Sequence, residues 1–458
     1  MKSVFRKMLS LMLLILTIIV LVKVFGIYKS KDYNDFVRAE KTPYTSQFTR
    51  DNEITVENNA SYKIKSEKFN DAMFYETVKV DPQTPYKVTC MVKTENIEKQ
   101  ENNFGGGAQI SIEGTTERSN AISGTNDWQK LTLYFDSKDR TEVNIGFRLG
   151  GYDNKCTGTA WFSDITFESG IADKSNTWKF VCFIFKNLDV NLQENGANKQ
   201  YKISMSQNDI SLAKENMKRF KNTCEELSRN KMQVNYDIIE IDTPITSISY
   251  DEKNAYYINP TDIEAIIEPY MQKKEYDHIY AVVRLGDLAK NIEIPVNDWI
   301  GLGGMDYHNI GFSNIRFPND ATSYMYRYDA SINQFPEEVF LHEFLHSLER
   351  NLTEYGYEIP ALHDNEKYGY KSEKLISLKN WYKDYMQKNI DANGTKIGLD
   401  DVAYTIKPVH ESNFKYSYKM DIENEPQNII EEIRSIVNNL INVFSRIKAG
   451  ESISINIQ

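Results

Sequence analysis

The sequence predicts a multidomain chain in which an all-β sandwich is followed by an α+β domain. Between residues 51 and 170, short alternating apolar runs are separated by glycine, asparagine, aspartate and proline, which is typical of a sandwich. After about residue 175 the rhythm changes, and strand-like runs alternate with helical ones. The chain has 458 residues, which is enough for two or three separate cores.

The composition narrows the possible partners. Hydrophobic residues make up 41% and charged residues 26% of the chain, as in ordinary folded proteins. The formal net charge is -11, from 65 acidic and 54 basic residues. Because phosphate binding needs a basic surface, we expect no nucleic-acid partner.

The N-terminus carries a targeting pattern. Lys2, Arg6 and Lys7 precede an uncharged, mostly apolar run from residue 8 to residue 22, which predicts a signal-anchor or signal peptide over residues 1–28. No small-residue cleavage site follows and no cysteine lies nearby for a lipid, so an uncleaved anchor is favoured. We therefore expect an extracellular protein, anchored in the membrane or secreted, and a polar linker over residues 29–50.

The predicted sandwich covers residues 51–170, with strands over 74–80, 86–93, 108–112, 129–135, 142–149 and 160–167. A strand end at Val80-Asp81-Pro82, a new strand at Tyr86, a turn at Gly105-Gly106-Gly107 and tryptophans at 128 and 161 follow one another in order. In this order the block resembles the jelly-roll carbohydrate-binding modules. The resemblance implies a possible glycan surface as a partner, although we expect Trp128 and Trp161 to lie inside the sandwich.

The four cysteines form no Cys-x-x-Cys pair, so a zinc knuckle is excluded. They are Cys90, Cys156, Cys182 and Cys224. We interpret them as buried apolar residues, while an exported chain could also pair some of them in disulfides.

The second domain is predicted over residues 175–458. Strands are expected over 178–185, 234–241 and 278–285. Helices are expected from Asn208 or Asp209 to about residue 230, and over 262–274.

The strongest chemical signal is His342-Glu343-Phe344-Leu345-His346. Two histidines four residues apart lie on one side of a helix and can hold one metal ion, and the glutamate between them can act as general base. Catalytic zinc binds neutral imidazole and leaves a position for water. The apolar residues at 341, 344, 345, 348 and 352 form a stripe that should face the core.

With this motif the chain resembles the zincin metallopeptidases over about residues 301–371, and the resemblance implies Zn²⁺ as cofactor and peptide-bond hydrolysis as activity. Metzincins have glycine and histidine where this chain has Glu349 and Leu352, so that subclass is excluded. His363 is the favoured third ligand, and Glu366 is the gluzincin alternative. Glu349 is a further candidate ligand, or a hydrogen-bond partner of a ligand histidine.

Other features of this region fit a peptidase. The alternating run at 310–317, entered through glycines at 301, 303 and 304, could be the strand that holds an extended substrate. Tyr368 and Tyr370 could donate to an oxyanion. His278, His308 and His410 have no ligand spacing and are expected to be structural.

The sequence thus predicts an extracellular zinc metallopeptidase acting on a protein or glycoprotein, with Glu343 as base and His342, His346 and His363 as ligands. The alternative is a glycan-binding cell-surface protein whose metal site does no chemistry.

Overall fold

The structure is a computed structural model that describes residues 36–100, 105–151, 154–194, 196–287, 290–297, 299–317, 335–415 and 418–421. The predicted N-terminal segment 1–28 lies outside these residues, as does 422–458 at the end of the second predicted domain. Within the described ranges, no helix is both long enough and apolar enough to cross a membrane.

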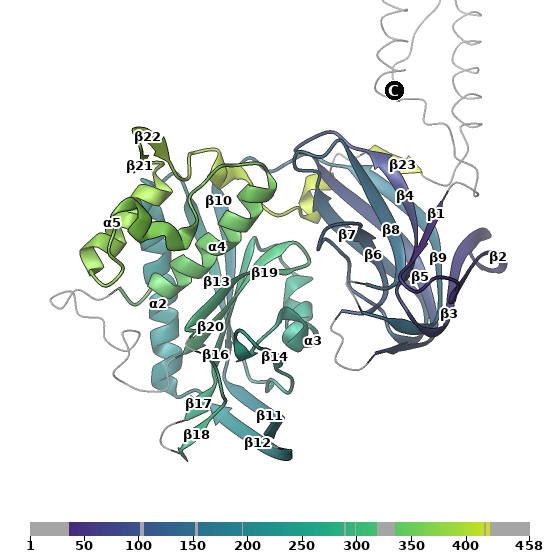
Figure 1. Cartoon of the computed structure of the whole chain (residues 1–458), viewed down its shortest axis with the longest axis horizontal. Helices are drawn as coiled ribbons and strands as arrows, with labels where there is room; N and C mark the ends of the chain where they lie inside the picture. The colour runs from purple at the N-terminus through teal and green to yellow at the C-terminus, as the bar shows by residue number, and fades with distance from the viewer. Residues whose placement is uncertain are drawn as a thin grey trace, which may run out of the picture.

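The first half of the chain is the predicted β-sandwich (Figure 1). One sheet has the order β1 (Val37–Glu40), β4 (Ala72–Lys79), β8 (Glu142–Gly150) and β6 (Gly107–Ile112). The other has the order β2 (Ser46–Val56), β3 (Asn59–Asn70), β9 (Cys156–Ser169), β5 (Pro85–Lys99) and β7 (Gly124–Asp136). All these pairs are antiparallel, and alternate residues such as Ile64, Val88, Phe135, Phe147 and Phe162 fill the space between the sheets.

The predicted linker over 29–50 is wrong for its described part. β1 pairs with β4, and β2 pairs with β3, so the sandwich begins at Val37. These are the first strands of their sheets and are largely exposed, which explains their polar sequence. Phe36 and Phe48 nevertheless pack against the sandwich core.

The sandwich also receives a strand from the far end of the chain. β23 (Tyr418–Asp421) pairs with β9 at residues 166–169. β3 pairs with β9 only between residues 156 and 162, so this part of the β9 edge is open to another strand. The predicted sandwich, which ends at residue 170, therefore leaves out β23. No pattern in the sequence indicates that residues 418–421 belong to the sandwich.

The second domain is built on a mixed sheet of five strands. Its order is β13 (Gln233–Ile241), β10 (Thr177–Phe185), β16 (His278–Arg284), β20 (Ile310–Phe317) and β19 (Gly301–Tyr307). The first four strands are parallel, and β19 is antiparallel to β20. Both faces of the sheet are covered, and residues 180–185 of β10 accordingly form a continuous apolar run.

The helices divide between the two faces of this sheet (Figure 1). Phe180, Cys182 and Ile184 of β10 share a core with α2 (Gln207–Leu227), α4 (Glu338–Glu354) and α5 (Leu375–Met386). The alternate residues Val181 and Phe183 share a second core with α3 (Pro260–Met271).

Smaller elements complete the domain. They are the strands β11 (Asn187–Glu194), β12 (Ala197–Ser204), β14 (Ser249–Asp251), β15 (Ala255–Tyr257), β17 (Gly286–Asp287), β18 (Ile292–Glu293), β21 (Ile390–Ala392) and β22 (Thr395–Ile397), and the 3₁₀ helices η3 (Leu362–Tyr368), η4 (Ala403–Thr405) and η5 (Glu411–Phe414).

Helix α2 begins earlier than predicted. Ser206, rather than Asn208 or Asp209, is the N-cap: its hydroxyl accepts a hydrogen bond from Asp209 N, and the Asp209 carboxylate accepts one from Ser206 N. This reciprocal pair of hydrogen bonds is a capping box, in which Asp209 is the third residue of the helix and not the N-cap.

The four cysteines are buried, as interpreted from the sequence, and none of them is in a disulfide. The expectation that both tryptophans lie inside the sandwich is wrong. Trp161 is buried, but its neighbours Ala160 and Phe162 join the core between the sheets and Trp161 does not; its Nε1 donates to Asp51. Trp128 is half-buried.

Candidate metal centre

Helix α4 carries the motif on a face fixed by its own apolar stripe. Leu341, Phe344, Leu345, Leu348 and Leu352 are all buried against the core shared with α2 and α5, as the spacing predicts. Packing of this stripe fixes the orientation of the helix about its axis. His342 and His346 therefore lie next to the stripe, at the border between core and solvent.

The structure brings the three predicted histidines together. His346 Nε2 lies 3.1 Å from His342 Nε2 and 3.0 Å from His363 Nε2. Each of the three offers one nitrogen to a group whose members all lie within 4.8 Å of one another. Tetrahedral zinc with Zn–N bonds of 2.0–2.1 Å would place its nitrogens about 3.3 Å apart, so the donor set fits such an ion.

The outer nitrogens of two of these rings are held by polar partners. His342 Nδ1 is 2.9 Å from the hydroxyl of Tyr382 on α5, and this hydroxyl also bonds Glu338. His346 Nδ1 is 3.0 Å from Glu349 Oε2. A partner at Nδ1 fixes the ring orientation and directs the Nε2 lone pair toward a shared cation.

Glu349 also connects the helix to the segment that carries His363. Its Oε1 accepts a hydrogen bond of 3.1 Å from Leu362 N, at the start of η3. Of the two roles that the sequence left open for Glu349, the structure therefore supports the hydrogen-bonding role. Glu366 lies exposed on η3 and is not in the three-histidine group.

Glu343 is buried against the edge strand, with 6% of its surface exposed. A Cβ on Gly301 would lie 2.5 Å from Glu343 Oε1, and a Cβ on Gly303 would lie 2.3 Å from its backbone oxygen. The two glycines thus let β19 approach the helix at the carboxylate. Burial raises the pKa of Glu343 to about 7, although His346 and a backbone hydrogen bond from Gly303 act in the opposite direction.

The burial of the site also affects the imidazoles. Desolvation, together with the neighbouring His346 and His363, lowers the pKa of His342 to about 3. Desolvation and His346 likewise lower the pKa of His363. Neutral imidazole is the form that binds a metal, so these environments favour coordination.

A groove of about 690 Å³ opens over the histidines. Its walls are the edge strand β19, helix α4, η3 and the tip of the β14–β15 hairpin, with Lys253, Asn254, Asn297 and Trp299 among the lining residues. The sequence did not predict that this hairpin borders the groove, because residues 253 and 254 belong to no recognisable motif.

Two sequence-based expectations for the groove are wrong. The run at 310–317 is β20, an internal strand, whereas the glycine-rich segment at 301–307 is the edge strand β19. Tyr368 stacks on Trp381, and Tyr370 donates to Asp384 on α5, so neither is among the groove residues.

The remaining histidines lie elsewhere, as expected. His278 is buried with its Nε2 3.0 Å from Ser313 Oγ, His308 pairs with Glu264, and His410 pairs with Asp277.

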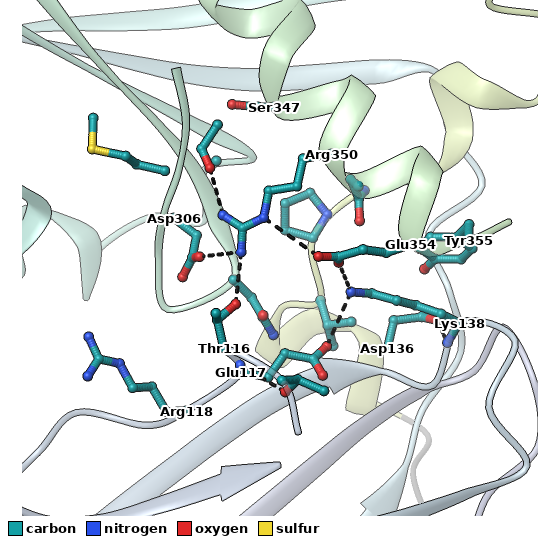
Figure 2. Close-up of a pocket in the computed structure, with 18 of the residues that line it drawn as sticks. Thr116, Glu117, Arg118, Asp136, Lys138, Asp306, Ser347, Arg350, Glu354 and Tyr355 are labelled. Atoms are coloured by element: carbon teal, nitrogen blue, oxygen red, sulfur yellow. Dashed lines mark hydrogen bonds and ion pairs between the residues drawn. The ribbon is translucent and has the colours of Figure 1, made fainter. Parts of the chain in front are cut away.

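Behind the groove, helix α4 faces the sandwich across a cavity of about 1280 Å³ (Figure 2). Arg350, one turn beyond His346, donates to Gly304 O on β19, to Asp306 and to Thr116 of the sandwich. Glu354 on the next turn pairs with Lys138 of the sandwich. Arg350 and Gly304 line both the groove and this cavity, so the sandwich is connected to the wall of the metal centre.

No protein-family model and no curated protein matches the sequence. Among solved structures, the chain is similar to the enzymatically active domain of tailspike protein 4 from bacteriophage CBA120, at 11% identity and a TM-score of 0.24, over 30% of this chain and 21% of that one. It is similar to the carbohydrate-binding module CBM4, at 16% identity and a TM-score of 0.21, over 31% of this chain and 92% of the module. It is also similar to the module TmCBM61 in complex with β-1,4-galactotriose, at 12% identity and a TM-score of 0.22, over 30% of this chain and 89% of the module. The chain thus spans about a fifth of the length of the tailspike domain and most of the length of each module.

Proposed function

We propose that the second domain is a zinc-dependent hydrolase that cleaves peptide bonds in a protein or glycoprotein substrate. One observation carries the proposal: three imidazole Nε2 atoms converge beside a buried carboxylate, in a groove bordered by an edge strand. The zincin resemblance of the motif points to the same chemistry. The proposal includes export directed by residues 1–28 as a signal-anchor or signal peptide, which would place the enzyme outside the cell.

His342, His346 and His363 would hold the ion, and Tyr382 and Glu349 would orient two of them. When bound, zinc supplies a Lewis acid that polarises a carbonyl and lowers the pKa of water. Glu343 takes the proton of the attacking water and delivers it to the leaving amine.

The edge strand supplies a place for the substrate backbone. β19 is the last strand of the sheet, so an extended peptide could add to it by backbone hydrogen bonds. The carboxylate of Glu343 lies against Gly301 of this strand, so a peptide bound there would pass close to the base.

The test is zinc content measured together with cleavage of a mixed peptide library, for the full chain. We expect about one zinc per chain in the wild type, retained in Glu343→Gln and lost in His346→Ala. Glu343→Gln should cleave no peptide. Cleavage by that variant at the wild-type rate, or wild-type protein that binds no zinc, would overturn the proposal.

Glycan binding by the sandwich, beside a metal site that does no chemistry, is the second candidate. It is favoured by the sandwich architecture and by the resemblance of the sequence features between residues 51 and 170 to those of carbohydrate-binding modules. A glycan array probed with the full chain tests it directly. Glycan binding by a wild-type protein that cleaves nothing would make this candidate the better one.

A further inference from the structure

The groove carries two cationic side chains, Lys253 and Arg350, and they differ in their surroundings. The Arg350 guanidinium bonds Gly304 O, Thr116 and Asp306 and pairs with Glu354. The Lys253 ammonium is exposed and, over the part of the chain that the structure describes, has no hydrogen-bond or ion-pair partner. Lys253 is therefore the cation in the groove that is available to a ligand.

The backbone around Lys253 is firmly held. Asp251 accepts hydrogen bonds of 2.6 Å from Asn254 N and 2.9 Å from Asn254 Nδ2, which closes the tip of the β14–β15 hairpin. The carbonyl of Lys253 accepts a bond of 2.7 Å from Asn297 Nδ2, and that of Asn254 accepts one of 3.0 Å from Trp299 Nε1. The tip is thus braced from two sides, and little backbone entropy is lost when Lys253 binds a ligand.

Lys253 also lies near the metal ligands. It lines the same groove as His342, His346 and His363. The whole chain carries a net charge of -11. An available ammonium in the groove would therefore be a local positive charge on an acidic protein, and it would attract an anionic group of a ligand.

We propose that Lys253 is a specificity-determining residue that binds a carboxylate of the substrate, so that the groove selects peptides with an acidic group near the cleaved bond. The proposal rests on the proposed hydrolase function. The carboxylate could be an Asp or Glu side chain or the free C-terminus of a peptide, since both offer the same acceptor to the ammonium.

The first experiment is a peptide-library digest read by mass spectrometry, with free and amidated C-termini in parallel. If Lys253 binds an acidic side chain, the peptides cleaved by the wild type should have Asp or Glu enriched at one position. If it binds a free C-terminus, cleavage should occur at a fixed distance from that terminus and should be lost when the terminus is amidated. Lys253→Ala should lose the preference, and Lys253→Glu should shift it toward Lys and Arg. Lys218→Ala, at an exposed position on α2, is the matched control and should keep the wild-type pattern.

The second experiment measures binding without turnover. In zinc-loaded Glu343→Gln protein, we expect Lys253→Ala to weaken binding of the best acidic peptide by about 10-fold, as for loss of one charge-assisted hydrogen bond. Binding of the same peptide with Gln in place of Glu should be unchanged by Lys253→Ala. Zinc content should stay at the wild-type level.

The possible failures are distinguishable. If the wild type cleaves no peptide, the proposed hydrolase function fails. If it cleaves acidic and neutral peptides equally well, the hydrolase stands and the role of Lys253 is refuted. Loss of zinc in Lys253→Ala would also refute that role, because the residue would then support the metal centre instead of the substrate.

Discussion

The close approach of β19 to helix α4 leads to a prediction about Gly301. A Cβ at this position would lie 2.4 Å from Glu343 Cγ and 2.5 Å from Oε1. Ordinary carbon contacts begin near 3.5 Å, so in Gly301→Ala the Glu343 side chain must move by roughly 1 Å. The backbone of Gly301 has no left-handed conformation, so the effect of alanine is due to this contact and not to backbone strain.

A displacement of about 1 Å in a catalytic group can cost about 100-fold in rate. We therefore expect kcat/KM of Gly301→Ala to fall about 100-fold, which corresponds to about 2.7 kcal/mol in the activation free energy. The loss should be in kcat, because the base moves while the rest of the groove stays in place. Zinc content should not change, since the three atoms that lie nearest to the added Cβ all belong to Glu343 and not to a histidine.

The assay is hydrolysis of a fluorogenic peptide chosen from the library digest, with zinc content measured on the same samples. Met305→Ala is the control: it removes a side chain from the same strand that packs on the opposite core and does not line the groove. It should lower the free energy of unfolding and leave kcat near the wild-type value. Full activity in Gly301→Ala would refute the idea that β19 fixes the position of the base.

Four further substitutions test the candidate metal site and one buried histidine outside it. Tyr382→Phe removes the hydroxyl at His342 Nδ1, so we expect zinc affinity to fall 10- to 100-fold in chelator competition. His363→Ala should abolish zinc binding, whereas Glu366→Ala should leave the zinc content unchanged, because only the histidine lies with the other ligands. Burial lowers the pKa of His278 to about 3, so the folded state does not take up the proton that the unfolded state binds below pH 6.5. Stability from this group is therefore complete above pH 6.5 and is lost as pH falls toward 3, by about 1.4 kcal/mol between pH 7.5 and 5.5. His278→Gln should lack this loss in urea unfolding at the two pH values.

Specific outcomes would contradict these predictions. Unchanged zinc affinity in Tyr382→Phe would mean that the hydroxyl does not orient His342. Loss of zinc in Glu366→Ala would mean that Glu366, and not His363, is the third ligand. Equal pH dependence in His278→Gln and wild type would show that other groups account for the acid sensitivity.

The sequence by itself determined the elements whose signals are local. Period-two alternation predicted six strands of the sandwich, because each strand has one face on a shared core. The 3.6-residue stripe beginning at Leu341 predicted the rotation of α4, and with it the placing of His342 and His346 on one side. His363 is favoured by the sequence because it is followed by Asp364, in a short segment that begins at Pro360, which suits a ligand histidine with a carboxylate close by.

The tertiary structure decided everything that depends on pairing between distant segments. Polar sequence before residue 51 suggested a linker, but β1 and β2 are sheet-edge strands, which need few apolar residues. The edge position of β19 follows from the order of five strands, which no local pattern encodes. Tyr382, 40 residues from His342, and Lys253, on a hairpin far from the motif, reach the site only because the fold brings their elements there. Spacing along a helix is fixed by backbone geometry, whereas contacts between elements depend on how whole faces pack. The placing of His342 and His346 side by side was therefore predictable, and the surroundings of the candidate site were not.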